Sequence, residues 1–156
     1  MNDTTKKKLK LKVSAIKDGT VIDYIPARNL FKVITILGLD KIENQITFGT
    51  NLESEKLGEK AIIKVSDKFF ADDEINKIAL IAPHAKLNII RDYEVVEKKV
   101  VEIPDTIKGI VKCFNPKCIT NHEKIATCFT LVAKEPLALK CKYCEKITSE
   151  EQIKMY

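Results

Sequence analysis

The chain has 156 residues, of which 45 % are hydrophobic and 31 % are charged, and its formal net charge is +5. This length suffices for one ordinary domain, or for one domain followed by a small metal-stabilised one, and the composition is that of a soluble globular protein. No apolar run is long enough to cross a bilayer, and the basic start lacks the apolar segment of a secretory signal, so we expect a cytoplasmic protein with no membrane partner.

Several lysines lie close to the N-terminus. Such a run can form a nucleic-acid-binding arm, or it can be a solvated tail that leads into a strand. Two of these lysines alternate with the apolar residues at positions 9, 11 and 13, which is the period of a half-buried strand, and we favour the second interpretation. The run comprises Lys6, Lys7, Lys8, Lys10 and Lys12.

The next predicted elements are a strand and a helix. Asp18-Gly19 is a typical turn, and the β-branched residues of Thr20–Ile25 favour an extended conformation. Pro26 is placed to open a helix and Gly38 is placed to end it. The apolar residues of this helix follow the spacing i, i+3, i+4 and i+7, and they are Leu30, Val33, Ile34 and Leu37.

Two strands, a second helix and a further strand follow. The strands are predicted at Gln45–Leu52 and Lys60–Val65, and Lys86–Val96 is extended again. The helix begins at Asp72-Asp73, because acidic side chains are favourable at a helix N-terminus. It would bury Ile75, Ile78, Ala79 and Ala82 and stop at Pro83. The order βαββαβ predicts an α+β fold, a ferredoxin-like antiparallel sandwich whose second sheet face is free for a partner or ligand.

Four cysteines form two pairs in the last third of the chain. Cys113 and Cys118 stand in C-F-N-P-K-C, and Cys141 and Cys144 stand in C-K-Y-C. Two such turns can supply four thiolates to a tetrahedral Zn²⁺. Four thiolates fill the coordination shell of the ion, so we predict one structural zinc and not four thiols without a metal. Pro104 marks the boundary between a domain of residues 1–103 and a zinc-ribbon, rubredoxin-like β domain of residues 104–156. The strands of this second domain are expected near Ile107–Lys112, Ile125–Val132 and Leu137–Lys140.

Other reactive residues have simpler explanations. Cys128 lies in a strand pattern and is predicted to be a small buried side chain rather than a ligand, and His122 is a weaker candidate ligand than the four thiolates. The chain has only two histidines, no glycine-rich phosphate loop and no nucleophile motif. We therefore expect no catalytic residues and no enzyme.

Lysines of the first domain are candidates for binding a nucleotide. Lys60 and Lys64 are four residues apart in a strand and project on one face. Together with Lys98 they could hold phosphates, with Asp23 at the ribose hydroxyls and Asn88 at the edge of the base. Spacing alone favours the alternative that these strand lysines simply face water.

Three segments resemble one family. G-T-V-I-D-Y-I-P-A (19–27), N-I-I-R-D-Y-E-V-V (88–96) and L-K-C-K-Y-C-E-K (139–146), with the cysteine spacing, closely resemble the regulatory chain of aspartate carbamoyltransferase, and the similarity runs from about Leu11 to Ile147. The resemblance implies a non-catalytic subunit whose first domain binds the effectors CTP and ATP and pairs with a second copy. It also implies that the zinc domain contacts the catalytic chain, and that the subunit regulates the first committed step of pyrimidine biosynthesis.

The same resemblance implies an effector site. Asp23 would contact the ribose, Lys98 the phosphates, and Lys60 would lie close to the triphosphate. Tyr24 stands where the family commonly has His, and a phenol carries no positive charge near neutral pH, so phosphate affinity is expected to differ. The complete implied set is Val13, Ala15, Ile16, Val21, Asp23, Tyr24, Lys60, Lys64, Asn88, Ile90, Tyr93, Val95 and Lys98.

A zinc-ribbon protein that binds nucleic acid is the alternative from another class. It would need a cationic surface and aromatic side chains on which bases stack. The zinc region is nearly charge-balanced, and its aromatic residues are few, mainly Phe114, Phe129 and Tyr143. We therefore expect no DNA partner.

Overall fold

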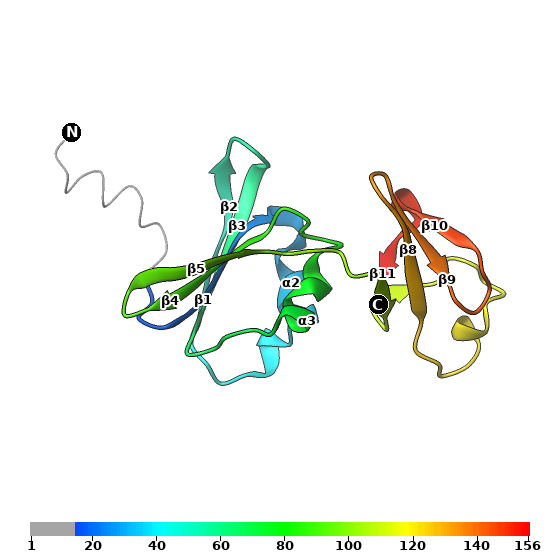
Figure 1. The fold of residues 1–156 in the computed structure, drawn as a ribbon, viewed down its shortest axis with the longest axis horizontal. Helices are drawn as coiled ribbons and strands as arrows, with labels where there is room; N and C mark the ends of the chain where they lie inside the picture. The colour runs from blue at the N-terminus through cyan, green and yellow to red at the C-terminus, as the bar shows by residue number, and fades with distance from the viewer. Residues whose placement is uncertain (1–14) are drawn as a thin grey trace. The chain divides into compact units, whose positions relative to one another are not determined.

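The computed structural model describes residues 15–156, and the chain divides into two compact units, Met1–Glu102 and Ile103–Tyr156 (Figure 1). The strand expected at positions 9 to 13, which includes Val13 of the implied effector site, lies outside the described residues. Among the helices of residues 15–156, none is both long and apolar enough to span a membrane.

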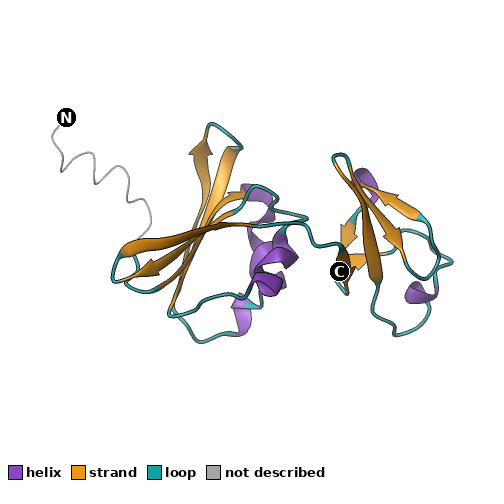
Figure 2. Ribbon diagram, in the orientation of Figure 1, coloured by secondary structure: helices purple, strands orange, loops and turns teal. Residues whose placement is uncertain are grey.

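The first unit is built on a five-stranded antiparallel sheet (Figure 2). The strand order is β2-β3-β1-β4-β5, so β3 lies between β1 and β2, and β1 lies between β3 and β4. The first four strands have the split-βαβ arrangement of a ferredoxin-like fold, which confirms the predicted fold class. The strands are β1 Gly19–Pro26, β2 Ile46–Ser54, β3 Gly58–Ser66, β4 Lys86–Arg91 and β5 Glu94–Val100.

The helices of this unit lie on one face of the sheet (Figure 1). The 3₁₀ turn η1 (Ala27–Asn29) leads into α2 (Leu30–Ile36), and Gly38 ends the helical segment in the left-handed conformation with φ 67°, as predicted. A further 3₁₀ turn, η2, covers Leu39–Lys41. The second helix is shorter than expected, because α3 (Asp72–Ile75) is a single turn that tightens into η3 (Asn76–Ile78) well before Pro83.

The core of the first unit lies between the helices and the sheet. Ile22, Ile63 and Val65 project from the central strands and are fully buried. Leu30 and Ile78 meet them from the helical side and are also fully buried. Each such side chain stabilises the fold by about 1.5–3 kcal/mol through burial. Alternation along the same strands directs the intervening residues to the opposite face, which we call the open face.

The prediction of one continuous strand at Lys86–Val96 is wrong. Asp92 and Tyr93 both have positive φ, 51° and 66°, and the chain reverses there in a hairpin turn. The turn is held by the Asp92 N–H, which donates to Asp18 Oδ1 at 3.0 Å, and by the Tyr93 N–H, which donates to the Lys17 carbonyl at 2.8 Å. As a result β5 runs back beside β4.

The second unit consists of short strands in two small sheets. The predicted strand Ile107–Lys112 is divided by Gly109, whose φ is 68°, so that its two halves join different sheets. A third strand begins at Cys128 rather than at Ile125. The four-stranded sheet has the order β10-β9-β8-β6, with β6 Thr106–Lys108, β8 Cys128–Lys134, β9 Leu137–Cys141 and β10 Ile147–Ser149. The other sheet pairs β7 (Val111–Lys112) with β11 (Lys154–Met155), and η4 (Ile119–Asn121) and η5 (Glu150–Gln152) are 3₁₀ turns.

Candidate functional site

The four paired cysteines converge in the second unit. Cys113 and Cys118 follow β7, Cys141 ends β9, and Cys144 lies in the turn before β10. All four sulfur atoms lie within 4.8 Å of one another, with 3.7 Å between Cys113 and Cys144 and 3.8 Å between Cys118 and Cys141. Tetrahedral thiolates at about 2.3 Å from Zn²⁺ are about 3.8 Å apart, so the cluster is suited to one structural zinc.

Hydrogen bonds to backbone carbonyl oxygens hold the two cysteine turns in shape. The side chain of Asn121 donates to the carbonyl oxygens of Cys113 and Asn115, at 3.0 and 2.7 Å. In the other turn the Cys141 N–H donates to the Lys146 carbonyl at 3.0 Å. These contacts position the sulfur atoms through the backbone, as the outer groups of a metal site commonly do.

The thiols differ in acidity. Burial is the main cause that raises the pKa of Cys113 to about 12, and it also raises the pKa of Cys141. Burial acts in the same direction on Cys144, but hydrogen bonds from the Lys146 backbone and the Asn115 side chain, with the neighbouring thiols, lower its pKa to about 7. Cys113 and Cys141 therefore hold their protons at neutral pH, and a metal must displace them.

Metal affinity should consequently fall in acid. Protons and metal compete for the same sulfur atoms, so below pH 7 the apparent zinc affinity should drop by up to about 10⁴-fold per pH unit, a factor of ten for each proton displaced. Competition with a chromogenic chelator between pH 5 and 8 measures this slope. Cys128→Ala is the matched control and should titrate like the native chain. A pH-independent affinity would show that the thiols do not bind the metal as a set.

The remaining candidate ligands lie outside the cluster. Cys128 is buried in β8, as predicted. His122 is exposed, and its Nε2 lies 2.8 Å from the Pro116 carbonyl oxygen. Among residues 15–156, the cluster of potential metal ligands contains the four paired cysteines and neither of these residues.

A row of side chains crosses the open face of the first unit. In register, Lys64 of β3 lies opposite Val21 of β1, Val21 lies opposite Asn88 of β4, and Asn88 lies opposite Lys98 of β5. Thr47 of β2 extends the row beyond Lys64. Four residues of the implied effector site are thus neighbours, although they span nearly eighty positions of the sequence.

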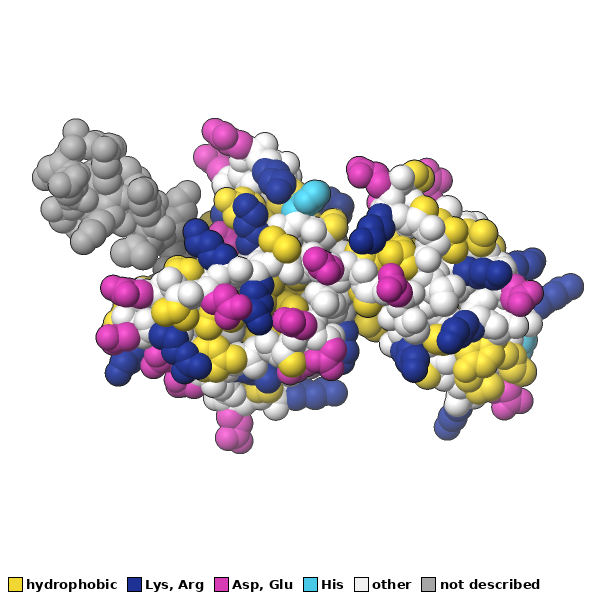
Figure 3. All heavy atoms as spheres, viewed as in Figure 1, with side chains coloured by type: hydrophobic (Ala, Val, Ile, Leu, Met, Phe, Trp, Pro, Cys, Tyr) yellow, Lys and Arg dark blue, Asp and Glu magenta, His cyan; other side chains and the backbone are white. Residues whose placement is uncertain are grey.

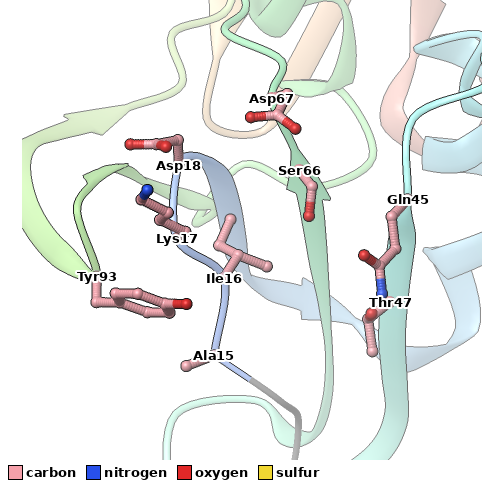
Figure 4. A pocket seen from close by; sticks show the side chains of 9 residues that line it. All are labelled: Ala15, Ile16, Lys17, Asp18, Gln45, Thr47, Ser66, Asp67 and Tyr93. Atoms are coloured by element: carbon pink, nitrogen blue, oxygen red, sulfur yellow. The ribbon is translucent and has the colours of Figure 1, made fainter.

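A cavity of about 320 Å³ lies at one end of this face. Figure 4 shows residues 15–18 running between Tyr93 on one side and Gln45 and Thr47 on the other. Ala15, Ile16 and Tyr93 of the implied set therefore line one cavity. The next row of the sheet places Ile90 opposite Val95.

Asp23, Tyr24 and Lys60 form a compact group at the other end. A β-bulge between Ile22 and Ile25 inserts Asp23 and Tyr24 opposite a shorter stretch of β3, and Tyr24 has φ 59°. Lys60 Nζ lies 2.9 Å from Asp23 Oδ1 and 4.3 Å from the centroid of the Tyr24 ring. The bulge therefore directs two consecutive side chains toward the same ammonium group.

Lys64 is affected by the same carboxylate. Partial burial lowers the pKa of Lys64, and the negative charge of Asp23 opposes that shift. One acidic group thus influences two lysines of the open face. Sequence reasoning missed two further residues of this surface, Thr47 and Lys86, although Lys86 lies two positions before Asn88 and strand alternation puts both on one face.

The fold and the metal site define a two-part protein, a ferredoxin-like unit joined to a four-cysteine metal-binding unit. Comparison with known families gives the particular family. Residues 11–102 match the aspartate carbamoyltransferase regulatory chain, allosteric domain, and residues 105–154 match its metal binding domain. The chain belongs to the family of aspartate carbamoyltransferase regulatory chains.

Individual relatives cover almost the whole chain. The regulatory chain of Bacteroides fragilis is 59 % identical over 143 residues, which are 92 % of this chain and 94 % of that protein. The regulatory chain of Pyrococcus abyssi is 55 % identical over 145 residues, covering 92 % and 95 %. That of Porphyromonas gingivalis is 51 % identical over 149 residues, covering 96 % and 99 %.

Proposed function

We propose that this chain is a non-catalytic, cytoplasmic subunit that binds the effectors CTP and ATP on the open face of its first unit. Through them it would regulate aspartate carbamoyltransferase at the first committed step of pyrimidine biosynthesis. The observation that carries the proposal is the row formed by Lys64, Val21, Asn88 and Lys98 beside the Asp23–Lys60 pair. The naming of the matched region as an allosteric domain supports it.

The chemistry of the row suits a nucleotide. Ammonium groups such as that of Lys98 attract phosphates, and the Asp23 carboxylate can accept hydrogen bonds from ribose hydroxyls. The Asn88 amide both donates and accepts, so it can pair with the edge of a base. Ile90 and Val95 offer apolar contacts in the adjacent row.

Replacing Lys98 tests the phosphate contact. Lys98→Ala should weaken CTP and ATP binding about tenfold, because it removes one charge-assisted contact, without unfolding the exposed end of β5. Lys99→Ala is the matched control, since Lys99 points to the helical side and bonds Asp72 at 3.2 Å. Calorimetric titration measures both variants. Equal affinities would remove Lys98 from the site.

The second unit is proposed to contact the catalytic chain, and two copies are proposed to pair through their first units. A bound nucleotide would bias these contacts by a coupling free energy of about 1–3 kcal/mol, the usual range for allosteric proteins. The cognate catalytic chain, mixed with the zinc-loaded chain, should form a larger complex on size-exclusion chromatography. Carbamoyltransferase activity in that complex should respond to CTP and ATP. No complex in the presence of zinc would contradict the proposal.

No nucleic-acid partner is proposed. Binding to a phosphate backbone requires a concentrated cationic field. On the face of the molecule seen in Figure 3, basic and acidic side chains are interspersed.

A further inference from the structure

Cys144 differs from the other three cysteines of the metal cluster in its access to solvent. The other three are at most 2 % exposed, whereas Cys144 is partly exposed. It lies in the turn between β9 and β10, and its neighbours on either side, Tyr143 and Glu145, are exposed as well. A small solute such as a peroxide can therefore reach one sulfur atom of the cluster from solvent while the other three stay covered.

A second thiol lies in position to react with an oxidised Cys144. Cys113 Sγ is 3.7 Å from Cys144 Sγ. A movement of about 1.7 Å would bring the two atoms to the disulfide bond length of about 2.0 Å. The remaining two cysteines, Cys118 and Cys141, face each other at 3.8 Å. The cluster thus consists of one pair that solvent reaches through Cys144 and one pair that is fully covered.

We propose that the cluster is also an oxidation site, at which Cys144 reacts first with a peroxide and Cys113 then closes a disulfide. In the first step the Cys144 thiolate attacks one peroxide oxygen, so that an S–O bond forms, the O–O bond breaks and hydroxide leaves. In the second step the Cys113 thiolate attacks the Cys144 sulfur, so that an S–S bond forms, the S–O bond breaks and a second hydroxide leaves. Two thiolates are oxidised by two electrons, and the peroxide is reduced.

The disulfide removes two of the four metal ligands. Structural zinc is held by four protein ligands, and after oxidation only Cys118 and Cys141 remain, so the metal should be released. A thiol reductant with added zinc should restore the site, because a disulfide is a reversible product of thiol oxidation. Separation of the oxidised chain from the catalytic chain would follow, and this consequence alone rests on the proposed function.

Release of zinc from the loaded full chain, followed with a chromogenic chelator, tests the inference. Hydrogen peroxide should release the metal, which the chelator alone should not do, and peptide mass spectrometry should show Cys113–Cys144 as the first disulfide. Cys144→His should still bind zinc, because three cysteines and one histidine form a common structural site. It should release zinc at least about tenfold more slowly, because the exposed thiolate is gone. Cys128→Ala is the matched control, since Cys128 lies outside the cluster, and it should release zinc at the native rate.

Three results would overturn the inference. They are retention of zinc in peroxide, a first disulfide other than Cys113–Cys144, and a Cys144→His variant that loses zinc as fast as the native chain. If Cys144→His binds no zinc, the order of disulfides in the native chain decides alone. None of these measurements involves a nucleotide or the catalytic chain, so their failure leaves the proposed function untouched.

Discussion

Removal of zinc is expected to unfold the second unit and to leave the first unit folded. Residues 103–156 have strands of two to seven residues and a core of few large side chains, mainly Phe129, Leu139 and Ile107. Domains of this size depend on metals or disulfides for stability. A four-cysteine zinc site contributes about 10 kcal/mol or more of apparent binding free energy, which exceeds the stability of most small domains. The first unit has its own helix-covered core.

Amide spectra by NMR measure this outcome directly. Addition of a strong chelator should collapse the dispersed signals of residues 103–156 and preserve those of residues 15–102. Cys141→Ser should have the same effect, because it removes one ligand from a fully buried position. Cys128→Ala is the control, and it should retain both the metal and the dispersion. Persistence of the native signals in the metal-free chain would show that the zinc is dispensable for folding.

Gly19→Ala should be among the most destabilising single substitutions in the first unit. Gly19 has φ 140°, and a Cβ added there would lie 2.1 Å from the Val65 carbonyl oxygen and 3.0 Å from the Asp67 nitrogen. Both atoms belong to the backbone, so the clash can be relieved only by separating β1 from β3. We expect a loss of about 3–5 kcal/mol in the free energy of unfolding, at the upper end for point mutations.

Hydrogen exchange of the Ile63 amide, which lies on the neighbouring strand, reports this free energy for the first unit alone. Gly58→Ala is the matched control. Gly58 also has positive φ, 77°, but a Cβ there would meet no atom within 4 Å. Gly58→Ala should lower the free energy of unfolding only by the backbone strain of positive φ, which is about 1–2 kcal/mol. Similar losses for the two variants would mean that the contact with Val65 relaxes easily.

The parts of the fold that follow from local chemistry could be predicted from the sequence. The periodicity of Leu30 and Val33, with a glycine able to adopt positive φ at position 38, correctly predicted the first helix and its end. The spacing of the four cysteines was sufficient to predict the metal site, because the type of ligand and the length of each turn can both be read from the sequence.

Other features depend on backbone conformations that the residue types conceal. Tyr93 and Tyr24 both adopt positive φ, which is unusual for large side chains, so neither the hairpin after β4 nor the bulge in β1 has a recognisable sequence signal. The hairpin decides that Lys98 lies beside Asn88. Spacing alone therefore did not predict that these lysines lie together, and the family resemblance was needed to group them as a proposed effector site.

The central strand of the first unit serves two purposes at once, and this limits how the protein can evolve. Ile22 and Ile25 of β1 are fully buried on one face, whereas Asp23 and Tyr24 face the lysines on the other. A substitution in β1 that alters the proposed ligand preference is expected to disturb the packing of the buried neighbours as well. Evolutionary changes in the effector preference proposed above should therefore accumulate on the flanking strands β3, β4 and β5, whereas β1 should change little.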